Sequence, residues 1–179
     1  MLFHHQNTSM TFQQNLARAV NDEITIEEFS GFFSGKFEYT QVIIDGLYQA
    51  CEHENKDLVE YLLIAADSDG VDQAYLKVLD HLLSFRWHEK EEDIVMMLWF
   101  DIGGPEIVDC LYKASRIIYD WDEVRALQRK CIRALHDIGT PEAKEKIKLI
   151  ANTDDEHVRY FVRDFYEKNP EMLEWAYGA

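Results

Sequence analysis

The sequence predicts an all-α protein with about ten or eleven helices and no required strand. Hydrophobic residues make up 47% and charged residues 29% of its 179 residues, with only eight glycines and three prolines. A β-sandwich would need more turn residues, and a disordered chain would be less hydrophobic. One phrase is written twice, as DIGGPE at 101–106 and DIGTPE at 137–142, which indicates a helical repeat.

The N-terminal part predicts irregular helices. Residues 10–39 are expected to form two cap helices, Thr11–Val20 and Ile26–Ser34, because the end units of a repeat array are atypical. Residues 40–102 carry apolar side chains at helical spacing and predict degenerate helical repeats. Their last unit, 71–102, ends in the same Asp-Ile-Gly but lacks a matching internal turn.

The repeated phrase has the composition of a helix stop followed by a helix start. Gly103 and Gly139 are expected where one helix ends, because glycine enters the left-handed region without strain. Pro105 and Pro141 are expected at the first position of the next helix, where a missing N–H costs nothing.

A second repeated pattern, Asp-x-x-x-Val-Arg, occurs at Asp120–Arg125 and Asp154–Arg159. We expect the aspartates to cap the incoming helix and the valines, Val124 and Val158, to begin its buried stripe. The unit is therefore helix, turn, helix, turn.

This unit resembles a HEAT-like repeat, through its Pro-Glu opening, the aspartate in its turn and the Val-Arg pair after it. Residues 103–169 would hold two clear repeats, 104–138 and 140–168, with a C-terminal cap at 170–179. The resemblance implies one domain over residues 1–179, a right-handed α-solenoid of antiparallel helix pairs. Such arrays present a long surface that binds another macromolecule.

The chain is strongly acidic, with 34 Asp and Glu against 18 Lys and Arg and a formal net charge of −16. Residues 1–100 hold eighteen of the acidic residues and six of the basic ones. A field of this sign repels phosphate backbones and attracts a basic partner, so we expect no nucleic-acid ligand. Solubility is the alternative explanation for the acidity.

No motif predicts a catalytic residue, a cofactor or a metal site. GFFSGKF at 31–37 is one residue too short for a phosphate-binding loop, and the three cysteines, Cys51, Cys110 and Cys131, predict buried thiols. The sequence shows no signal peptide and no stretch of about 18 apolar residues that would span a membrane. We therefore expect a cytoplasmic protein without enzymatic activity.

Three surface features predict a partner site. The first is acidic. The second is a set of three tryptophans, Trp87, Trp121 and Trp175, which lie beside a turn or near an end. The structural alternatives are capped helix starts for the acidic residues and core packing for the tryptophans. The candidate partner residues are Asp67, Asp69, Asp72, Glu89, Glu91, Glu92 and Asp93, with Trp87 and Trp121. The third is a basic ridge, Arg125, Arg129 and Arg133, which either binds an anion or forms ion pairs within the array.

In size, acidity and expected fold, the chain resembles bacterial toxin immunity proteins of the contact-dependent growth inhibition type. The resemblance implies a non-catalytic protein that binds and blocks a basic toxin C-terminal domain of the nuclease type in the cytoplasm. A HEAT-like scaffold or adaptor for an unrelated protein is the alternative. HEAT-like DNA glycosylases need a basic groove, which a net charge of −16 disfavours. The sequence leaves the oligomeric state open.

Overall fold

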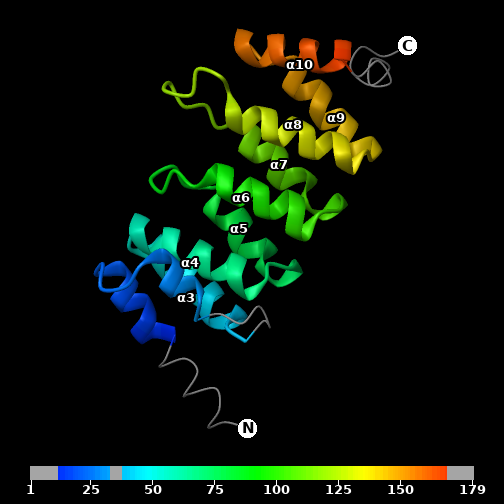
Figure 1. Cartoon of the computed structure of the whole chain (residues 1–179). Coiled ribbons are helices and arrows are strands. Elements are labelled where there is room, and N and C mark those ends of the chain that lie inside the picture. Colours follow the sequence, from blue (N-terminus) through cyan, green and yellow to red (C-terminus); the bar gives the residue numbers. More distant parts are fainter. Residues whose placement is uncertain (1–11, 33–37, 169–179) are drawn as a thin grey trace. The chain divides into compact units, whose positions relative to one another are not determined.

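The structure is a computed structural model that describes residues 12–32 and 38–168, and all regular secondary structure in these ranges is helical (Figure 1). The predicted all-α class is thereby confirmed. Of the expected cap helices, residues 12–20 are helical and α2 spans Ile26–Ser30. The expected C-terminal cap, 170–179, lies outside the described residues.

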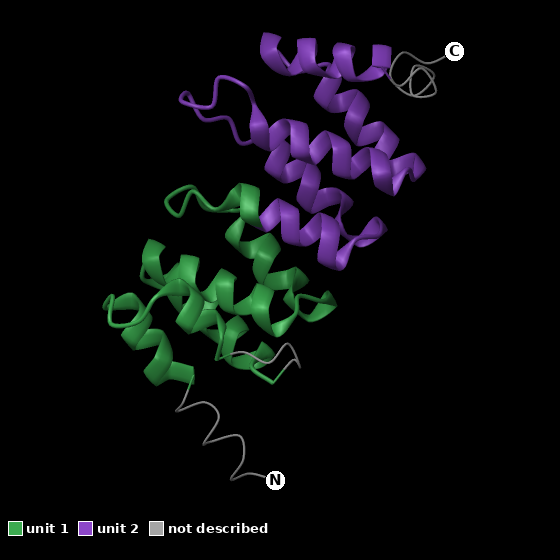
Figure 2. Cartoon of the chain, in the orientation of Figure 1, with its two compact units in different colours: residues 1–93 green, residues 94–179 purple. Residues whose placement is uncertain are grey.

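The chain divides into two compact units, residues 1–93 and 94–179 (Figure 2). After α2, the first unit contains α3 (Thr40–Glu52), α4 (Lys56–Asp69), η1 (Gln73–Tyr75) and α5 (Leu76–Leu82). The boundary falls within α6 (Glu91–Met97). The second unit continues with η2 (Leu98–Ile102), η3 (Pro105–Ile107), α7 (Val108–Ser115), α8 (Ala126–Ile138), α9 (Pro141–Ala151) and α10 (Glu156–Lys168).

In the first unit, α3 and α4 pack against each other. Ile43 and Leu47 of α3 and Leu62 of α4 are fully buried. Gly46 faces Leu62 with little space between them, because a Cβ atom there would be 3.2 Å from the Leu62 methyl groups. The Asn55 side chain accepts the Leu58 N–H at 3.0 Å and starts α4 immediately after the turn.

In the second unit, the DIGTPE phrase forms the predicted punctuation. Gly139 is left-handed (φ 66°, ψ 8°) and ends α8, and Pro141 is the first residue of α9. The Thr140 hydroxyl caps α9 by accepting the Ala143 N–H at 3.2 Å. Because the backbone preferences of Gly139 and Pro141 act locally, the sequence was sufficient to predict both of them, whereas the Thr140 cap was not predicted.

The DIGGPE phrase has a different backbone. Gly103 closes a π-helical turn, η2, by donating its N–H to the Leu98 carbonyl at 2.8 Å. Gly103 and Gly104 have positive φ angles of 63° and 77° with extended ψ values, and Pro105 starts the short 3-10 helix η3. The predicted positive φ and the first-position proline are present, but Gly103 has an extended ψ and does not adopt the left-handed helical conformation of Gly139.

The Asp-x-x-x-Val-Arg copies also differ. In the second copy, Val158 is buried as expected, but the cap of α10 is Asp155, whose carboxylate accepts the Val158 N–H at 2.9 Å, and not Asp154. In the first copy, α8 begins only after Arg125 and has no side-chain cap. Val124 therefore lies in the preceding loop and is 59% exposed, so the prediction that it begins a buried stripe is wrong.

Candidate protein-binding surfaces

Asp69, one of the predicted partner residues, is fully buried at the end of α4. Its carboxylate accepts the Thr40 hydroxyl at 2.9 Å, the Tyr39 N–H at 3.2 Å and the Tyr75 hydroxyl at 3.3 Å. Because all three donors come from its own unit, Asp69 has a structural role and is not available to a partner.

The position of Asp69 explains how α3 starts. The N-cap residue of α3, Tyr39, makes no side-chain cap hydrogen bond, and the first turn of α3 has no acidic residue. A carboxylate at the C-terminus of α4 opposes the dipole of that helix, whereas at the N-terminus of α3 it is favourable. Asp69 therefore caps α3 from the neighbouring helix.

The second acidic group surrounds the loop between α5 and α6. Glu91 is buried, with 2% exposure, and is excluded from a surface role in the same way as Asp69. Glu92 is half-buried, whereas Glu89 and Asp93 are exposed. Trp87 is half-buried beside them. We refer to Trp87, Glu89, Glu92 and Asp93 as the α5–α6 loop surface.

His88 fixes the backbone of this loop. Its ring is fully buried, with Nε2 2.9 Å from the Leu82 carbonyl and Nδ1 3.0 Å from the Lys90 backbone nitrogen. A carbonyl only accepts and an N–H only donates, so the ring is the neutral tautomer with its proton on Nε2. Both ring nitrogens are used, so His88 is a structural residue.

Two ion pairs connect the loop to α4. Lys56 donates a hydrogen bond to Glu89, and the Lys90 ammonium lies 3.1 Å from the Glu60 carboxylate. The hydrogen bond from Lys56 lowers the pKa of the Glu89 carboxyl, and the same bond raises the pKa of Lys56. Both Lys56 and Glu89 are about half exposed, so the pair adds little stability in water.

Asp67 and Asp72, the remaining acidic candidates, are exposed but lie near the other end of α4. At 1.5 Å of rise per residue, Asp67 is about 16 Å along the helix from Lys56, which holds the loop. Asp72 caps η1 by accepting the Ala74 N–H at 2.8 Å. The predicted acidic set is thus two separated groups and two buried structural residues.

Trp121 belongs to the second unit, in the loop between α7 and α8. Its indole is 64% exposed and is stacked on Tyr119 with ring centroids 5.1 Å apart. The prediction that this tryptophan is accessible to a partner is consistent with its position.

The basic ridge is not one continuous surface. Arg125 is largely buried and its Nε lies 2.9 Å from Asp155 Oδ2, whereas the Arg129 guanidinium lies over the Phe161 ring at 4.7 Å. Arg133 is exposed. Burial would raise the pKa of Asp155, but the hydrogen bonds from the Val158 N–H and from Arg125 outweigh it and hold that pKa below its ordinary value.

Sequence reasoning missed a second stacked aromatic pair, which lies in η2 and has one exposed member. Phe100 is 63% exposed and is stacked on Trp99 with centroids 4.4 Å apart. The Trp99 Nε1–H donates to Asp137 at 3.0 Å and fixes the indole on α8. No local sequence pattern predicted the π-helical turn, so the sequence alone did not distinguish this pair from core residues.

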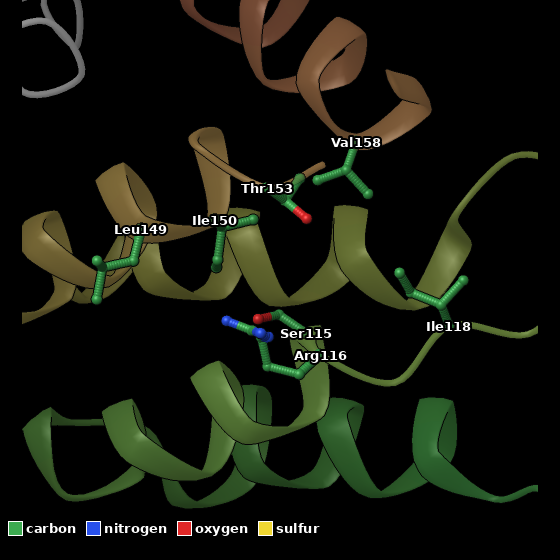
Figure 3. Close-up of a pocket in the computed structure, with 7 residues that line it drawn as sticks. All are labelled: Ser115, Arg116, Ile118, Leu149, Ile150, Thr153 and Val158. Atoms are coloured by element: carbon green, nitrogen blue, oxygen red, sulfur yellow. The ribbon is translucent and has the colours of Figure 1, made fainter. Parts of the chain in front are cut away.

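A pocket of about 120 Å³ lies in the second unit, between the end of α7 and the α9–α10 turn (Figure 3). Its walls combine the polar residues Ser115, Arg116 and Thr153 with apolar side chains. The apolar members are Ile118, Leu149, Ile150 and Val158.

Within residues 12–32 and 38–168, no group of three or more His, Cys, Asp or Glu side chains is placed to hold a metal ion. The three cysteines are buried thiols, as predicted. No helix in the described part of the chain has the length and hydropathy needed to cross a bilayer. No protein-family model matches this sequence, and neither a curated protein nor a solved structure does.

Proposed function

We propose that this chain is a non-catalytic, acidic immunity-type protein that binds and blocks a basic toxin domain of the nuclease type in the cytoplasm. In this proposal the helices form a HEAT-like right-handed solenoid of antiparallel pairs, and the α5–α6 loop surface contacts the toxin. The partner is a protein and not a nucleic acid or a membrane.

The observation that carries the proposal is the surplus of exposed carboxylates in the first unit. Residues 1–93 contain eighteen Asp and Glu against six Lys and Arg, and only Asp69 and Glu91 are buried. Three of the described cations already face carboxylates of the same unit, in the pairs Arg18–Glu23, Lys56–Glu89 and Lys90–Glu60.

A surplus of this kind accelerates encounter with a basic partner. Complementary charge raises association rate constants to about 10⁸–10⁹ M⁻¹s⁻¹ at low salt, and screening over a Debye length of about 8 Å at physiological salt reduces the gain. The fixed loop adds affinity, because a backbone that is already ordered loses little entropy on binding.

Co-expression with the toxin domain encoded directly upstream tests the proposal. We expect rescue of growth and a one-to-one complex whose association rate falls steeply with added salt. Rescue of growth without a complex, or a complex whose association rate does not change with salt concentration, would contradict the proposal. Neither rescue nor complex would favour the adaptor function, for which a proteome-wide pull-down identifies the partner.

A pair of matched charge-reversal variants localises the contact. The first replaces Glu89, Glu92 and Asp93 of the α5–α6 loop surface with lysine, and leaves the buried carboxylates intact. The control replaces Glu106, Glu145 and Glu167 of the second unit, all exposed, with lysine. Both triples change the net charge equally, so a loss of at least about tenfold in association rate for the first alone assigns the surface. Equal losses would mean that only total charge matters.

A further inference from the structure

The loop at 117–125, between α7 and α8, exposes three large apolar side chains within seven residues. Ile118 is 46% exposed, Trp121 is 64% exposed and Val124 is 59% exposed. Single exposed apolar residues are ordinary, but a group of them on one short segment marks an interaction surface. We call residues 117–125 the display loop.

The display loop is two consecutive turns built around Arg125. The Asp122 N–H donates to the Tyr119 carbonyl at 3.1 Å, and the Arg125 N–H donates to the Asp122 carbonyl at 3.2 Å. The Arg125 guanidinium also donates to both of these carbonyls. Trp121 and Val124 therefore occupy the outer positions of the turns, while the inner side holds a charged group.

Both ends of the display loop are held. The buried Gln128 side chain donates to the Ile117 carbonyl, and Arg125 Nε is ion-paired with Asp155 at 2.9 Å. Arg125 itself adopts a left-handed conformation with φ 54°, which a non-glycine residue keeps only when its surroundings hold it there. The exposed apolar side chains are thus presented by an ordered backbone.

Carboxylates surround the display loop. Asp120 and Glu123 are exposed within it, and the Arg125–Asp155 pair brings the exposed Asp154 and Glu156 alongside. Segments 116–125 and 153–159 together contain six Asp and Glu against three Arg. The local charge is therefore negative and complements a basic partner.

The pocket described above adjoins the display loop, because Ile118 lines it. Figure 3 shows Ile118 and Leu149 on opposite sides of the pocket, with Ile150 and Val158 between them. An apolar cavity of about 150 Å³ holds benzene, so the 120 Å³ here suits one aliphatic side chain.

We propose that the display loop and this pocket bind a basic protein segment that carries an apolar side chain between lysine or arginine residues. The apolar side chain enters the pocket between Ile118 and Leu149, the segment lies against Trp121 and Val124, and its basic residues meet the surrounding carboxylates. This surface belongs to the second unit and does not depend on the partner proposed for the first.

Fluorine NMR of the full chain with 5-fluorotryptophan tests the proposal, with the Trp121 signal assigned by Trp121→Phe. The probes are acetylated nine-residue peptides with a central Leu, Ile, Val, Phe or Met and two lysines on each side. Matched peptides carry glutamates in place of the lysines. We expect a saturable shift of the Trp121 signal with the lysine peptides alone, and unchanged Trp87 and Trp99 signals.

Two substitutions at exposed positions locate the contact. Leu149→Ser and Val124→Ser should each weaken binding of the lysine peptides at least about fivefold, as expected for the loss of one apolar contact. A variant is interpreted only if its Trp99 signal matches that of the unchanged protein, which shows that the second unit is still folded. If only one of the two variants meets this condition, its effect on peptide binding is sufficient to test the contact.

Three results would overturn the proposal. The first is the absence of a Trp121 shift with every lysine peptide at millimolar concentration. The second is an equal shift with glutamate peptides, which would remove the charge argument. The third is a dimer in sedimentation that Leu149→Ser converts to a monomer, because the surface would then bind a second copy of this chain.

Discussion

Asp69 and Asp67 lie two residues apart on α4 and provide a matched pair for testing the cap of α3. Asp69 is fully buried and accepts three hydrogen bonds, whereas Asp67 is exposed. We predict that Asp69→Ala strongly destabilises the first unit and that Asp67→Ala does not.

The magnitude follows from the three hydrogen bonds. Each bond to a charged group contributes about 1.5–3 kcal/mol, and donors left unsatisfied add to the loss. Two effects reduce the total, because the half-buried Thr40 hydroxyl can turn to water and the removed carboxylate no longer needs desolvation. We expect Asp69→Ala to lower the free energy of unfolding by about 2–4 kcal/mol, and Asp67→Ala to change it by less than about 0.5 kcal/mol.

Urea denaturation followed by circular dichroism measures the difference, as a shift in midpoint at constant slope. Amide hydrogen exchange provides the local readout, since loss of the cap should accelerate exchange in the first turn of α3 more than in the middle of α4. A cost below about 1 kcal/mol for Asp69→Ala, or equal costs for both variants, would refute the argument that this carboxylate caps α3.

Three further predictions concern the second unit and the pH limits of the fold. Arg125→Ala should lower the free energy of unfolding by about 2–4 kcal/mol, because it removes the charged donor from Asp155 and from two carbonyls, which then keep only their backbone donors, whereas Arg125→Lys should recover part of the loss; equal losses in urea denaturation would contradict this. Because the pKa of Asp155 is lowered in the folded state, its ionised carboxylate contributes stability at pH values above the ordinary aspartate pKa of about 3.9. That stability is lost as the pH falls below this value and through the lowered pKa. Asp155→Asn should therefore flatten the acid limb of a plot of unfolding free energy against pH, and an unchanged limb would contradict it. Burial, and then the neighbouring Asp69, raise the pKa of Tyr75, so its contribution is present below a pH of about 10 and is lost as pH rises further; Tyr75→Phe should make the alkaline limb less steep in the same measurement.

The candidate surfaces were predictable only in part, because burial depends on contacts that are distant in sequence. The sequence does not show which of Asp67, Asp69 and Asp72 is buried. Asp69 is buried because its carboxylate accepts hydrogen bonds from donors that lie 29 and 30 residues earlier in the chain. Arg125 likewise looked like part of a basic ridge, but its partner Asp155 lies 30 residues further on. For Trp121 the sequence left core packing as the alternative, and only the structure shows that its indole is exposed.

What the sequence determined by itself is the all-helical class and the punctuation at Gly139 and Pro141. Both follow from periodicity and from backbone preferences that act within a few residues. Only the tertiary structure decided which acidic side chains remain on the surface, and that the arginine of the first Asp-x-x-x-Val-Arg pattern organises a loop instead of a helix. These outcomes depend on which donors and acceptors meet when separate helices pack, and a buried charge is stable only where that packing supplies its partners.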